Sequence, residues 1–255
     1  MTYTIAVAGK GGVGKTTLCG LLIDTLRSQG GGPILAVDAD ASANLNEVLG
    51  VAAPLTLGSV REDIKTAGST DKIPTAMTRQ DYLDAKFLDA LTEEKDYDLL
   101  VMGRTQGAGC YCFVNGLLSA YLQKYARNYR FVVVDNEAGM EHLSRGILPR
   151  VDMLFIVSDC SRRGIQAAGN IRDLVRELGI RPGAVRFLIN KAPPGPLDAG
   201  IREEIERQGL ELACAVPRDD LIYAYDSAGK PTAALPAESP ARQALTALFR
   251  EALPL

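Results

Sequence analysis

The chain contains 255 residues, of which 47% are hydrophobic, enough to bury a core in the single domain that we expect over residues 1–255. The formal net charge is −3 and the charges are interspersed, so the sequence lacks the basic block that binding to nucleic acid or to an anionic membrane normally requires. No apolar run approaches the roughly 20 residues of a membrane span and no signal peptide precedes the first motif, so we expect a cytoplasmic protein.

The first motif is a glycine-rich loop between a predicted strand and a predicted helix. Residues 5–8 form an apolar run, and apolar residues recur at helical spacing between residues 18 and 26. A strand, a glycine-rich loop and a helix form a P-loop, in which main-chain N–H groups and the helix dipole hold a polyphosphate. We expect Lys15 to reach the β- and γ-phosphates and the Thr16 hydroxyl to bind Mg²⁺. The residues expected to bind the nucleotide here are Gly11, Gly12, Val13, Gly14, Lys15, Thr16 and Thr17.

The loop contains a second lysine, Lys10, five positions before Lys15. An ordinary P-loop does not require it. The pattern K-G-G-x-G-K-T-T resembles the deviant Walker A motif of the superfamily that includes the nitrogenase iron protein, MinD and ParA. The resemblance implies a homodimer that sandwiches nucleotide, in which Lys10 crosses the interface to the nucleotide bound by the other subunit.

An acidic segment follows the next predicted strand, residues 34–38. Apolar strands that alternate with helices predict a parallel sheet covered on both faces, and ligands of such sheets bind at the carboxyl ends of the strands. The segment from Asp38 to Leu45 resembles switch I of the superfamily. The resemblance implies that Asp40 orients or activates the water that attacks the γ-phosphate.

Residues 51–96 form a less regular excursion, for which we predict one or two helices. One amphipathic segment contains Tyr82, Leu83, Phe87, Leu88 and Leu91 at helical spacing. The excursion carries no recognisable chemistry. By analogy with switch ATPases, it is a candidate surface for docking a client protein.

Two cysteines, Cys110 and Cys112, lie beyond the strand predicted at residues 99–103. Thiolates at positions i and i+2 can face one metal ion, but a closed tetrahedral site needs four ligands. A two-fold dimer would bring both cysteines together with their mates as a four-thiolate set. We expect a helix to begin near Phe113. The other three cysteines are expected to be structural, and they are Cys19, Cys160 and Cys214.

The deviant loop combined with residues 107–115, GAGCYCFVN, resembles the carbon monoxide dehydrogenase maturation ATPases of the CooC family. The resemblance covers nearly the whole chain. It implies an ATPase that releases ADP, dimerises around nucleotide, and binds metal through Cys110 and Cys112. The implied cargo is Ni²⁺ for the nickel-iron-sulfur cluster of carbon monoxide dehydrogenase, whose apo-enzyme is the implied client. Zn²⁺ can occupy the same thiolates, because such ligand sets discriminate weakly between the two ions.

The strand predicted at residues 131–135 ends in the sequence DNEAG, residues 135–139. This position is typical of a Walker B aspartate followed by switch II. We expect Asp135 to hold Mg²⁺ through a water and the Gly139 N–H to contact the γ-phosphate. The only histidine of the chain, His142, is expected to be a surface or packing residue.

Two segments near the C-terminal end resemble the base-binding motifs of the superfamily. Asn190 and Lys191 follow the strand predicted at residues 185–189, and the resemblance implies that the Asn190 amide recognises the adenine edge. The second segment consists of Pro217, Arg218 and Asp219 at the end of the last predicted strand. A helix over residues 241–253 is expected to pack on the sheet, since its polar side carries too few cations for membrane attachment.

The sequence therefore predicts an α/β P-loop NTPase, with a mostly parallel sheet of about seven or eight strands and helices on both faces. Three alternatives to a nickel-inserting ATPase stay open at this point. They are a sister ATPase that serves acetyl-CoA synthase, a positioning ATPase of the MinD or ParA type without metal, and an iron-sulfur carrier like the nitrogenase iron protein.

Overall fold

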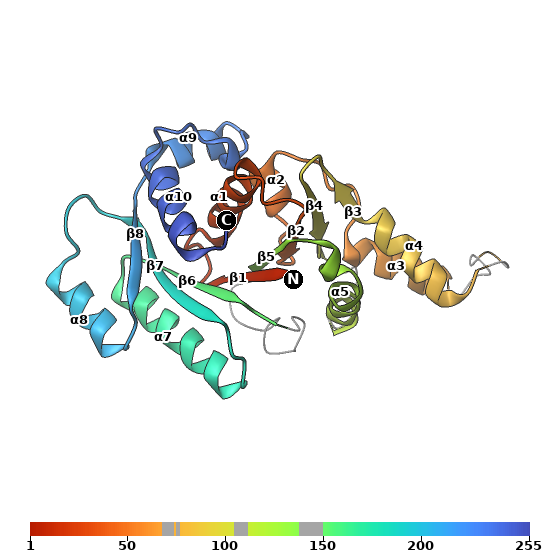
Figure 1. Cartoon of the computed structure of the whole chain (residues 1–255), viewed down its shortest axis with the longest axis horizontal. Coiled ribbons are helices and arrows are strands. Elements are labelled where there is room, and N and C mark those ends of the chain that lie inside the picture. The colour runs from red at the N-terminus through yellow and green to blue at the C-terminus, as the bar shows by residue number, and fades with distance from the viewer. Residues whose placement is uncertain (68–73, 75–76, 105–111, 138–149) are drawn as a thin grey trace.

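The computed structural model describes residues 1–67, 74, 77–104, 112–137 and 150–255. In this part of the chain, eight strands form one sheet in the order β3-β4-β2-β5-β1-β6-β7-β8 (Figure 1). All neighbouring strands are parallel except β3 and β4. The strands are β1 (Tyr3–Gly9), β2 (Ile34–Ala39), β3 (Leu91–Glu93), β4 (Tyr97–Val101), β5 (Phe131–Asn136), β6 (Met153–Asp159), β7 (Ala184–Ala192) and β8 (Leu212–Pro217).

Helices cover both faces of this sheet, as the alternation of apolar strands and helical segments predicts. They are α1 (Lys15–Ser28), α2 (Leu45–Leu49), α3 (Leu57–Ala67), α4 (Arg79–Asp89), α5 (Cys112–Tyr125), α7 (Arg162–Glu177), α8 (Ala199–Arg207), α9 (Asp220–Ser227) and α10 (Pro240–Ala252), with 3₁₀ turns η1 (Ala126–Asn128) and η2 (Thr232–Ala234). The predicted fold class, a mostly parallel sheet between helices, is confirmed.

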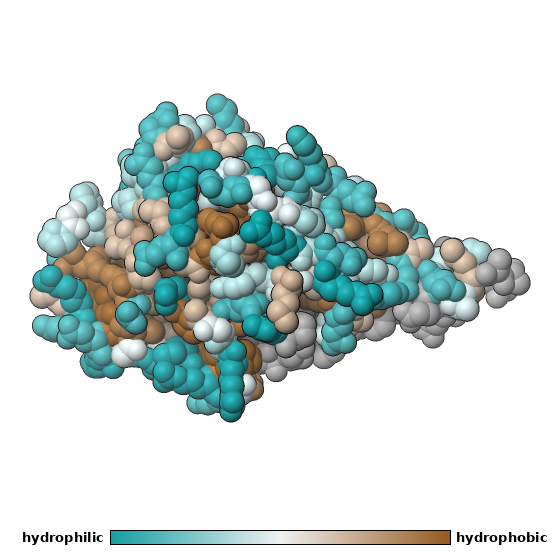
Figure 2. Space-filling view, viewed as in Figure 1, coloured by the Kyte–Doolittle hydropathy of each residue, from teal (hydrophilic) through white to brown (hydrophobic). Residues whose placement is uncertain are grey.

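The side chains of β1 show how the two layers of core form. Ile5 and Val7 pack in one cluster with α1 and α10, whereas Ala6 and Ala8 pack in another with α7. All four are fully buried, because successive side chains of a strand point to opposite faces and both faces are covered. A third cluster lies under α3, α4 and α5 at the other end of the sheet. On the face seen in Figure 2, hydrophilic residues predominate and several hydrophobic patches lie among them.

The register of the central strands brings the ends of β1, β2 and β5 together. Val7 of β1 pairs with Asp135 of β5, and Asp135 in turn pairs with Asp38 of β2. The strands are parallel, so their carboxyl ends share one edge of the sheet, and the loop after Gly9 begins at that edge. The sheet therefore places the acidic ends of two strands beside the glycine-rich loop.

The structure corrects the prediction for Leu91. Helix α4 ends at Asp89, and Leu91 begins the antiparallel strand β3, in which it pairs with Leu100. A tight turn closes this hairpin, with the Glu94 N–H donating to the Tyr97 carbonyl at 2.9 Å. Leu91 fits helical spacing from Phe87 and Leu88, so periodicity alone places it on the helix although the helix ends two residues earlier.

The C-terminal helix α10 packs on the sheet, as expected. Its residues Leu245, Leu248 and Phe249 are buried in the same cluster as α1. Among the helices of the described residues, none is long and apolar enough to cross a membrane.

Candidate active site

The loop between β1 and α1 has the backbone conformation of a phosphate cradle. Gly12 and Gly14 have φ angles of +80° and +93°, in the left-handed region that glycine adopts without steric cost. The loop then turns directly into α1, whose first backbone hydrogen bond runs from the Leu18 N–H to the Gly14 carbonyl at 3.1 Å. The free N–H groups at the start of α1 therefore face the same side as the loop.

The two lysines of the loop differ in their surroundings. Lys15 is 7% exposed, and its Nζ donates to the carbonyl of Lys10 at 3.4 Å. The Lys15 side chain thus folds back over the loop that precedes α1. The side chain of Lys10 is exposed. Lys15 therefore lies against the loop and Lys10 extends into solvent, and their predicted contacts with nucleotide stay predictions.

Two buried carboxylates, Asp38 and Asp135, stand at the carboxyl edge of the sheet, and each residue is 1% exposed. Burial raises the pKa of Asp135 to about 7, opposed by a hydrogen bond from the Thr16 hydroxyl and reinforced by the charge of Asp38. Burial also raises the pKa of Asp38, although N–H groups of Leu45 and Asp40 donate to its carboxylate at 2.9 and 3.0 Å. A cation between these groups would offset their desolvation.

The surroundings of Asp135 fit a magnesium ion. Among the residues that the structure describes, none donates a hydrogen bond to its buried Oδ1. Its carboxylate also contacts the Thr16 hydroxyl, the ligand predicted for Mg²⁺ in the loop. Carboxylate and hydroxyl oxygens are the ligands that this hard cation prefers. Thr16 and Asp135 are therefore the residues that would hold the ion.

Asp40 lies on the wall of a pocket of about 940 Å³. Its Oδ1 accepts a hydrogen bond from the Ser42 N–H at 2.7 Å, which fixes the direction of the carboxylate. The same pocket is lined by Gly12, Lys15 and Thr16. Asp40 therefore shares a pocket with the glycine-rich loop, and its predicted role in orienting water stays a prediction.

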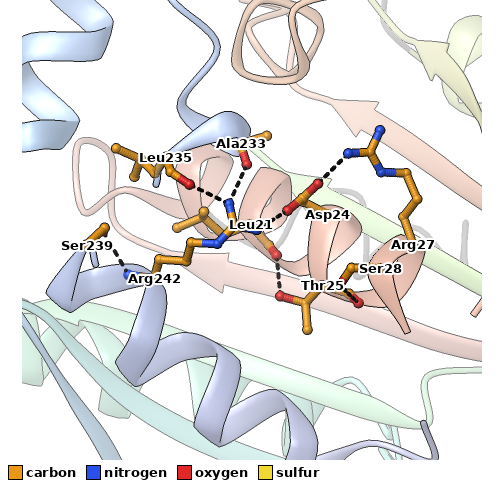
Figure 3. A network of polar contacts seen from close by, with 9 residues as sticks. All are labelled: Leu21, Asp24, Thr25, Arg27, Ser28, Ala233, Leu235, Ser239 and Arg242. Carbon is orange, nitrogen blue, oxygen red and sulfur yellow. Dashed lines mark hydrogen bonds and ion pairs between the residues drawn. The ribbon is translucent and has the colours of Figure 1, made fainter. Parts of the chain in front are cut away.

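Part of the lining of this pocket comes from the C-terminal segment, which the motifs did not indicate. It includes Lys230 and Thr232. A polar network holds this segment on α1: Arg242 donates to the carbonyls of Ala233 and Leu235 at 3.1 and 2.6 Å and pairs with Asp24 (Figure 3). The network explains why a segment more than 200 residues from the loop shares its pocket.

Sequence reasoning also left Asp38 and Asn136 without a role. Asn136 is 1% exposed and its Nδ2 donates to the carbonyl of Val7 at 2.9 Å, tying the end of β5 to β1. Both residues are polar side chains at the ends of otherwise apolar strands. That position was the available signal for them.

The pair Asn190-Lys191 lies against the glycine-rich loop. Asn190 is 9% exposed, and its Nδ2 donates to the carbonyl of Val13 at 2.8 Å. Nζ of Lys191 donates to the carbonyl of Gly12 at 3.0 Å. The structure thus places both residues at the nucleotide pocket's loop, whereas their predicted contact with the base stays a prediction.

The second predicted base-binding segment divides into an exposed and a structural part. Strand β8 ends at Pro217, and the Arg218 side chain is exposed and pairs with Asp220 at 3.3 Å. Asp219 caps α9, accepting from the Leu221 N–H at 2.9 Å. Its other oxygen accepts from the Ser239 hydroxyl before α10. Asp219 therefore joins the starts of two helices.

We expect Asp219→Ala to lower the free energy of unfolding by about 2 kcal/mol, because it removes the cap of α9 and leaves the buried Ser239 hydroxyl without its acceptor. Urea denaturation followed by circular dichroism measures this change. Asp220→Ala is the matched control, since the Asp220 side chain is 87% exposed and its loss should cost less than about 0.5 kcal/mol. Equal stability of the two variants would contradict the structural role of Asp219.

Some predicted residues lie outside the described part of the chain. They include Cys110 and residues 138–149, with Gly139 and His142. Cys112 is the first residue of α5, but its side chain is likewise outside what the structure describes. The four-thiolate site and the switch II contact therefore stay predictions.

The chain is similar in sequence to known nucleotide-binding proteins. The model of the CobQ/CobB/MinD/ParA nucleotide binding domain matches residues 4–232. An uncharacterized ATP-binding protein of Methanocaldococcus jannaschii is 44% identical over 232 residues, covering 91% of both chains. The carbon monoxide dehydrogenase accessory protein CooC of Rhodospirillum rubrum is 34% identical over 237 residues, covering 88% of this chain and 87% of its own.

Solved structures support the same fold. The cell division ATPase MinD of Pyrococcus furiosus superposes with a TM-score of 0.70 at 22% identity, over 98% of both chains. MinD of Pyrococcus horikoshii, solved in complex with Mg-ADP, gives a TM-score of 0.68 at 21% identity, over 98% of this chain and 96% of its own. At these identities the likeness shows the fold alone.

Proposed function

Because the chain belongs to the CobQ/CobB/MinD/ParA family of ATPases, we propose that it couples ATP hydrolysis to the delivery of a soft metal ion, Ni²⁺. The proposed client is the apo-enzyme of carbon monoxide dehydrogenase. The observation that carries this proposal is the 34% identity, over nearly nine-tenths of each chain, to a carbon monoxide dehydrogenase accessory protein. The cysteine pair of residues 110 and 112 supplies ligands suited to such an ion.

The proposed hydrolysis transfers the γ-phosphoryl group of ATP to water and releases ADP and phosphate. Lys15 and the N–H groups of the loop stabilise the charge that develops on the phosphoryl oxygens. Thr16 and Asp135 would hold a magnesium ion, which would supply further charge neutralisation when bound. Asp40 orients the attacking water from the pocket wall, and Lys10 of a second subunit completes the site.

The dimer links the nucleotide to the metal in this proposal. Two subunits that share both a nucleotide site and a four-thiolate site must change the affinity of one site when the other is filled, and this coupling is reciprocal. ATP binding would close the dimer and set the spacing of the thiolates. Hydrolysis would loosen the dimer and release the ion to the client.

We expect Cys110→Ser/Cys112→Ser to abolish metal-dependent dimerisation and to leave ATP binding intact, since serine hydroxyls replace two thiolates per subunit outside the P-loop. Light scattering during titration with Ni²⁺, with and without nucleotide, measures the oligomeric state, and the native chain should dimerise at one ion per dimer. Cys214→Ser is the control, because Cys214 lies half-buried in β8.

Activation of a client enzyme tests the nickel proposal and distinguishes the two candidate clients. The cysteine variant should lose nickel-dependent activation of carbon monoxide dehydrogenase, and unchanged activation would overturn the proposal. Activation of acetyl-CoA synthase instead would change the client and retain the metal chemistry. A native chain that retains no metal and behaves like the variant would support a positioning ATPase of the MinD or ParA type.

A further inference from the structure

Side chains at the carboxyl end of β7 donate hydrogen bonds to two consecutive carbonyl groups of the glycine-rich loop. Lys191 Nζ donates to the Gly12 carbonyl at 3.0 Å, and Asn190 Nδ2 donates to the Val13 carbonyl at 2.8 Å. The two donors are neighbours in sequence, and so are the two acceptors. The contacts span nearly 180 residues of chain, so they come from the tertiary fold.

These two hydrogen bonds determine where the loop's N–H groups point. In a planar trans peptide the carbonyl of one residue and the N–H of the next point in opposite directions. A Gly12 carbonyl held toward Lys191 therefore turns the Val13 N–H away from β7. A Val13 carbonyl held toward Asn190 does the same for the Gly14 N–H. These are N–H groups of the segment that cradles phosphate in a P-loop.

Asn190 and Lys191 are also packed tightly against the loop by their local geometry. A Cβ added to Gly14 would lie 2.4 Å from Asn190 Nδ2, so the amide leaves room only for glycine there. The Asn190 Oδ1 accepts from the N–H of Lys191 at 2.9 Å, so both ends of the amide are engaged. Lys191 itself has a φ of +57°, a conformation that lysine rarely adopts, and this turn directs it back toward the loop.

We propose that Asn190 and Lys191 are positioning residues for the phosphate groups: they orient the Val13 and Gly14 N–H groups, and they act on phosphate binding whichever base is attached. This role is distinct from the recognition of adenine that their motif implies. It rests on nucleotide binding in the loop and is independent of the nickel proposal.

The test compares ligands with and without a base. Lys191→Met keeps the apolar stem and removes the donor to the Gly12 carbonyl. We expect it to weaken the binding of Mg-ATP, Mg-GTP and magnesium tripolyphosphate by the same factor, about tenfold, measured by calorimetry. The ratio of ATP to GTP affinity and the unfolding temperature without ligand should not change. Lys191→Arg, which keeps a donor, should restore most of the loss.

Two further variants sharpen the comparison. Asn190→Asp places an acceptor opposite the Val13 carbonyl and should weaken all three ligands together. Lys95→Met, an exposed lysine on the turn between β3 and β4 at the opposite edge of the sheet, should change none of them. A loss confined to ATP and GTP, or a changed ratio between them with tripolyphosphate bound normally, would overturn the positioning role and leave base recognition as the function of the pair.

Discussion

Replacement of Lys15 by methionine is expected to lower kcat/KM for ATP about a thousandfold. Lys15 is 7% exposed and its Nζ lies within the loop, 3.4 Å from the Lys10 carbonyl, so the substitution removes a positive charge held inside the loop that is predicted to bind the phosphates. Methionine retains the apolar stem, and the fold should therefore be preserved. Steady-state hydrolysis and nucleotide titration measure the effect, with the unfolding temperature as the check on folding.

Lys10→Met offers a matched comparison, because Lys10 is exposed and is assigned to the partner's nucleotide. It should spare ATP binding by the monomer and remove hydrolysis. A mixed dimer of the two variants has one complete site, formed by Lys15 of the Lys10→Met subunit and Lys10 of the Lys15→Met subunit. An equal mixture should therefore regain about a quarter of the native rate if subunits pair at random.

The mixture also separates the two roles. If Lys10→Met hydrolyses ATP at the native rate, Lys10 is a solvated loop lysine and the sandwich dimer loses its support. If both variants are inactive and the mixture remains inactive under conditions where mixed dimers form, each lysine acts within its own subunit. Native activity in Lys15→Met would contradict the assignment of the loop itself.

Much of the fold could be predicted because its signals are local. The central strands are apolar on both sides, since both faces of the sheet are covered, and a helix such as α7 buries residues at helical spacing along one side. The order of the strands could not be derived in this way, because pairing depends on contacts between distant segments. Strand β3 was missed for a related reason: Leu91 fits a helical period, and only its pairing with Leu100 makes it a strand.

The candidate site also combines features that a local pattern predicts with features that depend on contacts between distant segments. The loop from Gly9 to Thr17 is contiguous, so its chemistry is contained in one short pattern. The bond from Asn190 to Val13 and the cap that Asp219 provides are set by how side chains point after folding. Motif resemblance placed these residues near the nucleotide. Their hydrogen-bond partners could only come from the structure.

Asp135→Asn is expected to stabilise the protein at pH 8 in the absence of magnesium and nucleotide. The native carboxyl has its pKa raised to about 7 from an ordinary value of 3.8, chiefly by burial. Below pH 4 it is protonated in both the folded and the unfolded chain. Between pH 4 and 7 the folded chain keeps a proton that the unfolded chain has lost, so its contribution to stability falls as the pH rises and is gone above pH 7.

The variant lacks this charge at every pH. Its advantage in the free energy of unfolding should grow from pH 4 to 7 and then level off at no more than about 4 kcal/mol, the value of a shift of about three pKa units. Urea denaturation of both proteins in EDTA across this range measures the difference. The charge of Asp38 contributes to the raised pKa of Asp135, so the difference between the two proteins includes the repulsion between these two carboxylates as well as the burial of Asp135.

Magnesium and ATP should reverse the order of stability. A cation that binds the folded native site stabilises it by mass action, whereas the variant has lost the carboxylate that holds the ion through water. Asp135→Asn should therefore gain less in unfolding temperature from Mg-ATP than the native protein does and lose hydrolysis. A variant that is less stable than the native protein at pH 8 in EDTA would show that the buried carboxylate is compensated within the apo fold. In that case the burial of the Asp135 carboxylate would cost the apo protein no stability, and binding of the ion could recover none.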